Sequence, residues 1–267
     1  MTTFQKIVKY FAIALAFAII AGVLVGVLRG ASFLSKISDA TTDDGVVEDI
    51  DSSADIRKLR VNLFRTNLKI VEGDRFSAET DNKDVTIKER MGTLVIEENS
   101  RSVIDSVPET EVVLTVPKGY SFRKIDVSTG AGNFFAEFVK AENIDFDFGA
   151  GKVSVDALYA TDKIEIDGGA GKIEIRDGET NNLDLDIGVG KLHYRAHITG
   201  DSEIDCGVGG VELVLTGGEE NYTVSLDKGI GNASINDEII ADGVTHGNGE
   251  NKIDIDGGIG DIEVIFE

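Results

Sequence analysis

The chain contains no tryptophan, two prolines and a single cysteine among its 267 residues. Because Cys206 is alone, no disulfide can form within the chain, and stability must come from packing and backbone pairing. Basic residues are also scarce: 26 Lys and Arg stand against 48 Asp and Glu, which gives a formal net charge of −22. This balance argues against nucleic acid as a partner, since phosphate binding needs clustered Lys and Arg.

Groups that could perform catalysis are few. The three histidines, His193, His197 and His246, have no serine or cysteine nucleophile at a suggestive spacing. No tryptophan is present to form a sugar-stacking platform, and the chain has only five tyrosines. We therefore expect a protein that is not an enzyme, with no catalytic residues and no bound cofactor, and an enzyme acting on polysaccharide is the least favoured alternative.

Glycine and aliphatic residues are abundant. The 31 glycines accompany a predominance of Val, Ile and Leu, a composition that suits short, tightly turned strands and suits helices poorly. The length allows one sizeable core with a small additional module.

The glycines form Gly-x-Gly pairs whose successive intervals are 19, 20, 19, 19, 22 and 29 residues. A period near twenty is typical of stacked repeats. A phosphate loop is excluded because Ile173 follows Gly171 and Lys172 where Ser or Thr is required, and Glu174 replaces the third glycine of a dinucleotide fingerprint. The pairs are Gly130/Gly132, Gly149/Gly151, Gly169/Gly171, Gly188/Gly190, Gly207/Gly209, Gly229/Gly231 and Gly258/Gly260.

Each repeat predicts two strands that meet at a glycine corner. In "IEIDGGAGKIEI" (164–175), apolar residues alternate with polar ones on both sides of the corner. Such a unit cannot bury its own apolar face, but copies stacked at ~4.8 Å share a core between two sheets. We therefore predict an all-β fold, a single-chain β-solenoid with rungs of about 20 residues. An antiparallel sandwich is the competing fold.

Three expectations concern the corners. The long interval between Gly231 and Gly258 should hold a looped-out insertion or a rung with a degenerate corner at Gly247/Gly249. Cys206, directly before a corner, should be buried and unreactive. The residue between the two glycines should point inward; these residues are Ala131, Ala150, Ala170, Val189, Val208, Ile230 and Ile259.

An aspartate stands two residues before six of the corners. In a solenoid these side chains form an outward column, in which like charges on neighbouring strands repel. Either Lys152, Lys172 and Lys191 lie beside the column and offset the repulsion, which we favour, or the carboxylates bind a divalent cation such as calcium. The candidate metal ligands are Asp147, Asp167, Asp186, Asp205, Asp227 and Asp256.

The segment Tyr10–Leu28 carries no charge over 19 residues. As a helix it spans about 28 Å, close to the ~30 Å hydrocarbon core and longer than the apolar run of a cleaved signal peptide. We predict a single-pass anchor in the cell membrane, with the acidic C-terminal part outside the cytoplasm. Small residues recur at every fourth position, which would permit a homodimer through the helix or simply reflects how common they are in such helices. They are Ala14, Ala18, Gly22, Gly26 and Gly30.

The predicted organisation has five parts. From 57 to 116, five alternating segments such as "KLRVNLF" and "EVVLTVP" are less regular than the later repeats and should cover one end of them. The parts are a cytoplasmic N-terminus (1–9), the membrane helix (10–28), an acidic linker (29–55), an irregular β module (56–119) and the regular solenoid repeats (120–267).

The order of these segments resembles a known bacterial envelope family. "LRVNLF", "LKIVEG", "VTIKE", "LVIEE" and "VVLTVPKG" precede "IDVSTGAG", "IDFDFGAGKVSV" and "IEIDGGAGKIEI", and the resemblance covers about 56–267. The family is a domain of unknown function (number four-zero-nine-seven), described as a β-strand-repeat "putative adhesin". It implies a solenoid at the bacterial cell surface, often behind a membrane anchor, and supplies no catalytic residues.

The sequence thus predicts a non-catalytic, membrane-anchored, extracytoplasmic β-solenoid for adhesion, binding or scaffolding at the bacterial cell envelope. The alternative is an accessory component of an envelope-stress or signalling system that contacts another membrane protein through its helix. The expected partners are the membrane through 10–28, a second copy through the same helix, and an envelope protein or surface ligand.

Overall fold

The computed structural model describes residues 46–48, 55–99 and 109–267. The chain divides into the units Met1–Asp43 and Asp44–Glu267, and every described residue belongs to the second. The part of the chain that the structure describes has no helix long and apolar enough to cross a membrane. The predicted span 10–28, with its face of small residues, lies outside the described residues.

The described residues form strands joined by short turns and one 3-10 turn. The first ten strands are β1 (Val46–Glu48), β2 (Lys58–Leu63), β3 (Asn67–Gly73), β4 (Ser77–Thr80), β5 (Val85–Arg90), β6 (Thr93–Glu98), β7 (Glu111–Pro117), β8 (Phe122–Thr129), β9 (Phe134–Ile175) and β10 (Gly178–Asn181). They are followed by β11 (Leu183–Thr199), β12 (Asp201–Leu215), η1 (Glu219–Asn221), β13 (Tyr222–Ile230), β14 (Ala233–Ile235), β15 (Glu238–Ile239), β16 (Val244–Gly247), β17 (Asn251–Ile259) and β18 (Ile262–Phe266).

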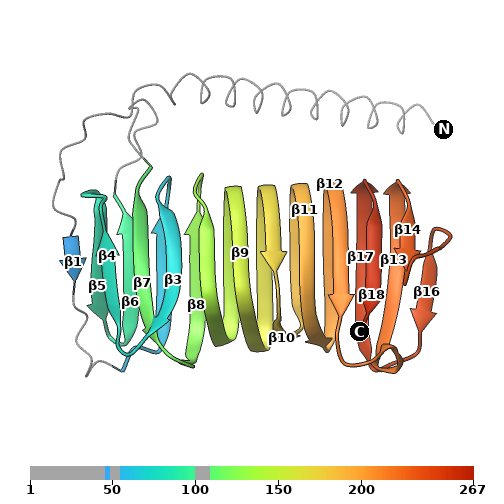
Figure 1. Ribbon diagram of the computed structural model, residues 1–267, viewed down its shortest axis with the longest axis horizontal. Coiled ribbons are helices and arrows are strands. Elements are labelled where there is room, and N and C mark those ends of the chain that lie inside the picture. The colour runs from blue at the N-terminus through green and yellow to red at the C-terminus, as the bar shows by residue number, and fades with distance from the viewer. Residues whose placement is uncertain (1–45, 49–54, 100–108) are drawn as a thin grey trace, which may run out of the picture. The chain divides into compact units, whose positions relative to one another are not determined.

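Successive repeats pair in parallel, which confirms the predicted all-β fold and gives it a solenoid-like form (Figure 1). Asp184 of β11 pairs with Glu165 of β9 on one side and with Glu203 of β12 on the other. Both offsets equal one 19-residue repeat. The parallel pairing excludes the antiparallel sandwich for these repeats, because that fold requires neighbouring strands to run in opposite directions.

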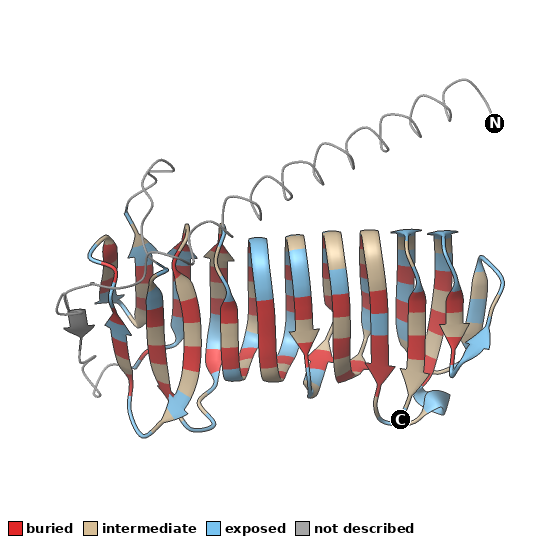
Figure 2. Ribbon diagram, turned by 45° about the horizontal axis from the view of Figure 1, so that its top comes forward, coloured by how far each residue is buried: buried red, intermediate tan, exposed pale blue. Residues whose placement is uncertain are grey.

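The core lies between two faces of the stack. We call the strands that precede the glycine corner the first face and those that follow it the second face. Along the first face Ile144, Phe146 and Phe148 are buried while the residues between them reach solvent. The same alternation recurs from rung to rung and produces bands of buried residues across the stack (Figure 2). The period-two sequence pattern therefore translates directly into one continuous apolar interior.

All seven glycine pairs lie in one column along the corner. At every pair, an added Cβ would overlap a main-chain carbonyl oxygen of the neighbouring rung. At Gly209 the backbone also has φ +150°, a conformation that essentially only glycine adopts. Glycine is thus required at these seven corners because adjacent rungs approach there backbone to backbone.

The residues between the glycines do not point inward, so that prediction was wrong. Ile230 is 63% exposed and Ile259 44% exposed. Val189 and Val208 are half-buried, and Ala131 and Ala150 are exposed. Phe148 and Val153, which flank the corner, fill the interior at the bend instead. Because the two faces converge there, the apex of the bend lies outside the core.

The rungs at the C-terminal end are not stacked in sequence order. On the first face β17 pairs with β12 on one side and with β13 on the other. On the second face β18 likewise lies between β12 and β14. The chain therefore leaves β12, builds the rung of β13 and β14 one position further out, and returns to fill the gap with its last rung. Figure 1 shows these C-terminal strands out of chain order.

The long interval between Gly231 and Gly258 contains a cap. Strand β15 pairs antiparallel with β14, and β16 pairs antiparallel with β13. The segment is therefore neither a looped-out insertion nor a rung with a corner at Gly247/Gly249, and both of those predictions were wrong. An antiparallel strand cannot continue a parallel stack, so it closes the end that a further rung would extend.

The N-terminal end of the stack also has rungs out of chain order and an antiparallel cap. The rung of β2 and β3 lies between the rung of β6 and β7 and the rung of β8 and early β9. Strands β5 and β4 pair antiparallel on the outer side of β6 and β7. Strand β1, from the predicted acidic linker, pairs antiparallel with β4. The less regular segment thus contributes two parallel rungs and a cap to the same stack.

One corner in the column has no glycine. Phe64–Thr66 takes the place next to Gly130 and Gly132. The Glu98 carboxylate accepts hydrogen bonds from the main-chain N–H groups of all three residues, with N···O distances of 2.6, 2.9 and 3.3 Å. Burial raises the pKa of Glu98, but these bonds together with Thr66 outweigh it and hold the pKa below its usual value. A carboxylate therefore stabilises the bend that glycines form elsewhere.

Candidate functional site

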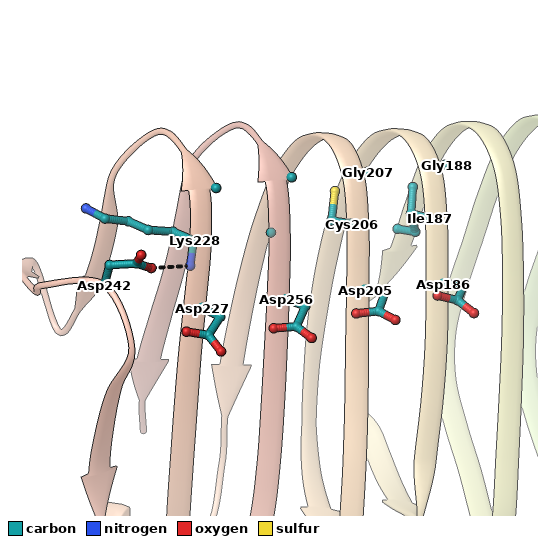
Figure 3. Close-up of a pocket in the computed structure, with 13 residues that line it drawn as sticks. Asp186, Ile187, Gly188, Asp205, Cys206, Gly207, Asp227, Lys228, Asp242 and Asp256 are labelled. Carbon is teal, nitrogen blue, oxygen red and sulfur yellow. Dashed lines mark hydrogen bonds between the residues drawn. The ribbon is translucent and has the colours of Figure 1, made fainter. Parts of the chain in front are cut away.

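The predicted aspartate column exists on the first face, and we call it the aspartate ladder. The strand registers place Asp186 opposite Asp167 and Asp205, and Asp256 opposite Asp205 and Asp227. Figure 3 shows the last four members in a row on successive rungs. The spatial order along the stack is Asp147, Asp167, Asp186, Asp205, Asp256 and Asp227.

No member of the aspartate ladder forms an ion pair with another described residue. Burial, followed by the negative charges of Asp186 and Glu165, raises the pKa of Asp167. Burial, Asp186, Glu203 and Asp256 likewise raise the pKa of Asp205. The column of like charge at one-rung spacing is therefore as predicted, but no cation of the described residues compensates it.

The lysines expected to offset this charge lie past the corner, on the second face. Lys172 donates to Glu174 at 2.8 Å, and Lys191 pairs in register with Lys172. The expectation that these lysines offset the ladder was therefore wrong. Residues after the corner belong to the other face, so a short sequence separation does not bring them beside the aspartates.

A second acidic column runs two residues before the ladder and is partly neutralised. Lys163 binds both Glu165 at 3.3 Å and Asp184 at 3.2 Å, and these bonds raise its pKa. Lys124 lies 3.6 Å from Asp145. Lys163 was not among the predicted site residues, although its position two residues before Glu165 places both side chains on the same face of the strand.

One group of carboxylates has the spacing of a metal site. In the described part of the chain, only Glu203, Asp205 and Asp256 bring three carboxylate oxygens within 4.8 Å of one another. Asp205 and Asp256 also line an open groove of about 700 Å³ with Asp186, Asp227 and Lys228. The other four predicted ligands do not join such a group. Calcium at these hard oxygen ligands remains a prediction.

The single cysteine is buried, and the three histidines each contact a different neighbouring residue. Cys206 is 5% exposed, and burial raises the pKa of its thiol, as expected for an unreactive core cysteine. His193 lies 3.1 Å from Glu212, His197 contacts the Thr216 carbonyl oxygen, and His246 lies 2.6 Å from Glu219. The histidines thus have three different partners and do not form one site.

We expect Asp205→Asn to stabilise the protein at neutral pH. The substitution removes a like charge from the ladder, and we expect a gain of about 0.2–1 kcal/mol that shrinks with added salt. Because the folded-state pKa of Asp205 is raised, the native chain gains stability as the pH falls through that pKa, so the advantage of asparagine should vanish below the ordinary value of 3.8. Urea denaturation at several pH values measures the difference in stability between Asp205→Asn and the natural chain.

Asp201→Asn is the matched control. Asp201 lies on the first face outside the ladder, 3.9 Å from Lys252, so its replacement should give no gain. A loss of stability in Asp205→Asn at neutral pH would contradict ladder repulsion. Calcium chloride provides a further comparison: a rise in Tm for the natural chain that is absent in Asp205→Asn would indicate a bound cation.

The geometry defines a class, a capped β-solenoid-like stack with aligned glycine corners. Residues 56–246, more than half of the chain, match the model of the Toastrack DUF4097 family. The chain therefore belongs to this family, as the sequence resemblance indicated. A search of the curated proteins gives no match.

Three of the solved structures that match this chain come from different bacteria. A putative cell adhesion protein from Clostridium sporogenes is 16% identical, with 84% of this chain and 99% of that chain covered and a TM-score of 0.41. A putative adhesin from Bacteroides fragilis is 12% identical, with 84% and 98% covered and a TM-score of 0.40. A putative adhesin from Parabacteroides distasonis is 18% identical, with 83% and 97% covered and a TM-score of 0.43.

Proposed function

We propose that the protein is a non-catalytic, membrane-anchored solenoid that binds or scaffolds at the outer side of the bacterial cell membrane. The anchor is the apolar segment 10–28, and the capped stack is the exposed binding domain. Calcium bound to the aspartate ladder would support this role by joining the acidic face to another anionic surface.

The observation that supports the proposal best is the in-register repetition of the outer surface. Each rung presents equivalent side chains at equivalent positions, as the ladder demonstrates from Asp147 to Asp227. Such a surface suits an extended or repetitive partner, because several weak contacts can act together along the stack. Both ends are capped by antiparallel strands, which favours side-on binding over growth by end-to-end stacking.

Cysteine labelling in intact cells tests whether the solenoid domain lies outside the cytoplasm. Cys206 is buried, so the natural chain should react little with a membrane-impermeant maleimide. Ile239 is 77% exposed in the C-terminal cap, and Ile239→Cys should be labelled strongly in intact cells if the domain is extracytoplasmic. The unsubstituted chain is the control. Labelling of Ile239→Cys only after lysis would contradict the proposal.

Crosslinking in the same cells tests the role. A set of cell-wall or surface products would support binding or scaffolding at the envelope. One dominant membrane-protein product would instead support the accessory role in an envelope-stress or signalling system.

A further inference from the structure

A hollow on the second face is separate from the aspartate ladder. Its volume is about 250 Å³. Neighbouring rungs supply its walls, since Tyr159 pairs in register with Glu179, and Asn181 with Thr199. The lining residues are Lys140, Tyr159, Ala160, Thr161, Glu179, Asn181 and Thr199.

Three of the polar groups that line this hollow have no partner among the described residues. The Tyr159 hydroxyl, the Lys140 ammonium and the Glu179 carboxylate make no hydrogen bond or ion pair with any described residue. Several charged side chains elsewhere on the second face are paired, among them Lys172 with Glu174 and Arg195 with Glu267. The hollow therefore gathers donors and acceptors that no other described side chain occupies.

The Tyr159 side chain of this hollow packs against a second aromatic ring. The Tyr159 and Phe138 rings lie 5.5 Å apart at 39°, and both residues are half-buried. Asn181 is fixed as well, since its Nδ2 donates to the Asp162 carbonyl oxygen at 3.2 Å and its Oδ1 accepts from Thr199 at 3.1 Å. Supported rings and anchored amides suit a preformed site, because little side-chain freedom is lost on binding.

We propose that this hollow binds one pyranose ring of a cell-surface glycan, an inference that rests on the proposed function. The apolar C–H face of the sugar would pack on Tyr159, Glu179 would accept hydrogen bonds from its hydroxyls, and Lys140 would donate to its oxygens. The volume is below the ~300–1,000 Å³ of pockets for drug-sized ligands, which fits a single ring. The lining has one carboxylate, whereas glycoside hydrolysis uses two, so the site binds without cleaving.

Isothermal titration calorimetry and saturation-transfer NMR test this site with cellotriose and chitotriose as probes. The full chain is used in phospholipid nanodiscs, because maltoside detergents would present competing sugars. We expect at least one probe to bind and Tyr159→Ala to weaken that binding at least tenfold. Glu179→Gln, which keeps the shape but removes the charge, should weaken it several-fold.

Phe135→Ala is the matched control. Phe135 is a half-buried aromatic residue on the same face and does not line the hollow. The Lys69 Nζ atom lies over its ring, 5.8 Å from the ring centroid. Loss of the Phe135 ring should leave sugar binding unchanged. Failure of both probes to bind, equal binding by Tyr159→Ala, or equal loss in Phe135→Ala would overturn the inference. Surface labelling of Ile239→Cys would be unaffected by any of these results, so it tests the proposed function separately.

Discussion

Deletion of residues 251–267 is expected to expose the chain from 222 to 247 while the earlier rungs stay folded. The deleted rung supplies four buried side chains, Ile253, Ile255, Ile262 and Val264. At about 1.5–3 kcal/mol for each fully buried side chain, roughly 6–12 kcal/mol of burial is lost. Rungs from Phe134 to Thr199 keep their neighbours on both sides, and β12 keeps its pairing with β11, so their protection should persist. Hydrogen exchange followed by mass spectrometry measures the amide protection of 222–247 and of the earlier rungs.

The exposed segment is not expected to slide into the gap. In the native register Lys228 pairs with Gly257. A shift by one rung would place Lys228 opposite Cys206, which is buried and directly before the corner. Lys228 would lose the space that Gly257, which has no side chain, leaves beside it, and overpacking of this kind costs about 1–3 kcal/mol. Undiminished protection of 222–247 in the deletion variant would contradict this expectation.

A separate peptide with the deleted sequence should restore the missing rung. A peptide of residues 251–267 carries strands β17 and β18 and can pair on both edges with β12, β13 and β14. We expect it to restore protection of 222–247. A control peptide with Ile255→Asp and Val264→Asp keeps the backbone pairing but places charges in the core, and it should not restore protection.

Gly209→Ala is expected to destabilise the protein by about 3 kcal/mol or more. The new methyl group would overlap the Gly190 carbonyl oxygen, and the main chain there has φ +150°. Such a conformation costs a residue with a side chain about 1–3 kcal/mol, and the steric overlap adds to this cost by separating the rungs. Urea denaturation followed by far-UV circular dichroism measures the change.

The adjacent Gly210→Ala is the matched control. Its nearest atom would be the Asp261 carbonyl oxygen at 3.7 Å, which is an ordinary contact, and its φ is not in the left-handed region. We expect a change within about 0.5 kcal/mol. Similar losses in the two variants would mean that the corner column does not depend on glycine at particular positions.

Local sequence was sufficient for the repeat and for the ladder. In "IEIDGGAGKIEI" the alternation of Ile164 and Ile166 with acids fixes one buried and one exposed side, and the glycines mark the bend. Equivalent residues then align because parallel strands of equal period pair in register. The placement of Asp167 beside Asp186 follows from this logic alone.

Details at the corner could not be read in the same way. Val189 and Val208 are apolar, but they lie at the apex of a bend where the two faces leave no interior space. Lys172 is close to the ladder in sequence but lies past the bend, bound to Glu174. The partner-free groups around Tyr159 come from separate rungs, and only the folded stack places Lys140 and Glu179 in one hollow.

The sequence by itself determined the rung, its corner and the side of each strand that is buried, because these depend on residues within about twenty positions of one another. Only the tertiary structure decided the order of rungs at the two ends, with β17 between β12 and β13, and β2 between β6 and β8. Near-identical rungs offer near-identical edges for pairing, so no local pattern selects a neighbour. The choice is made by the antiparallel caps, because a rung that carries an antiparallel strand on its outer side can lie only at an end of the stack.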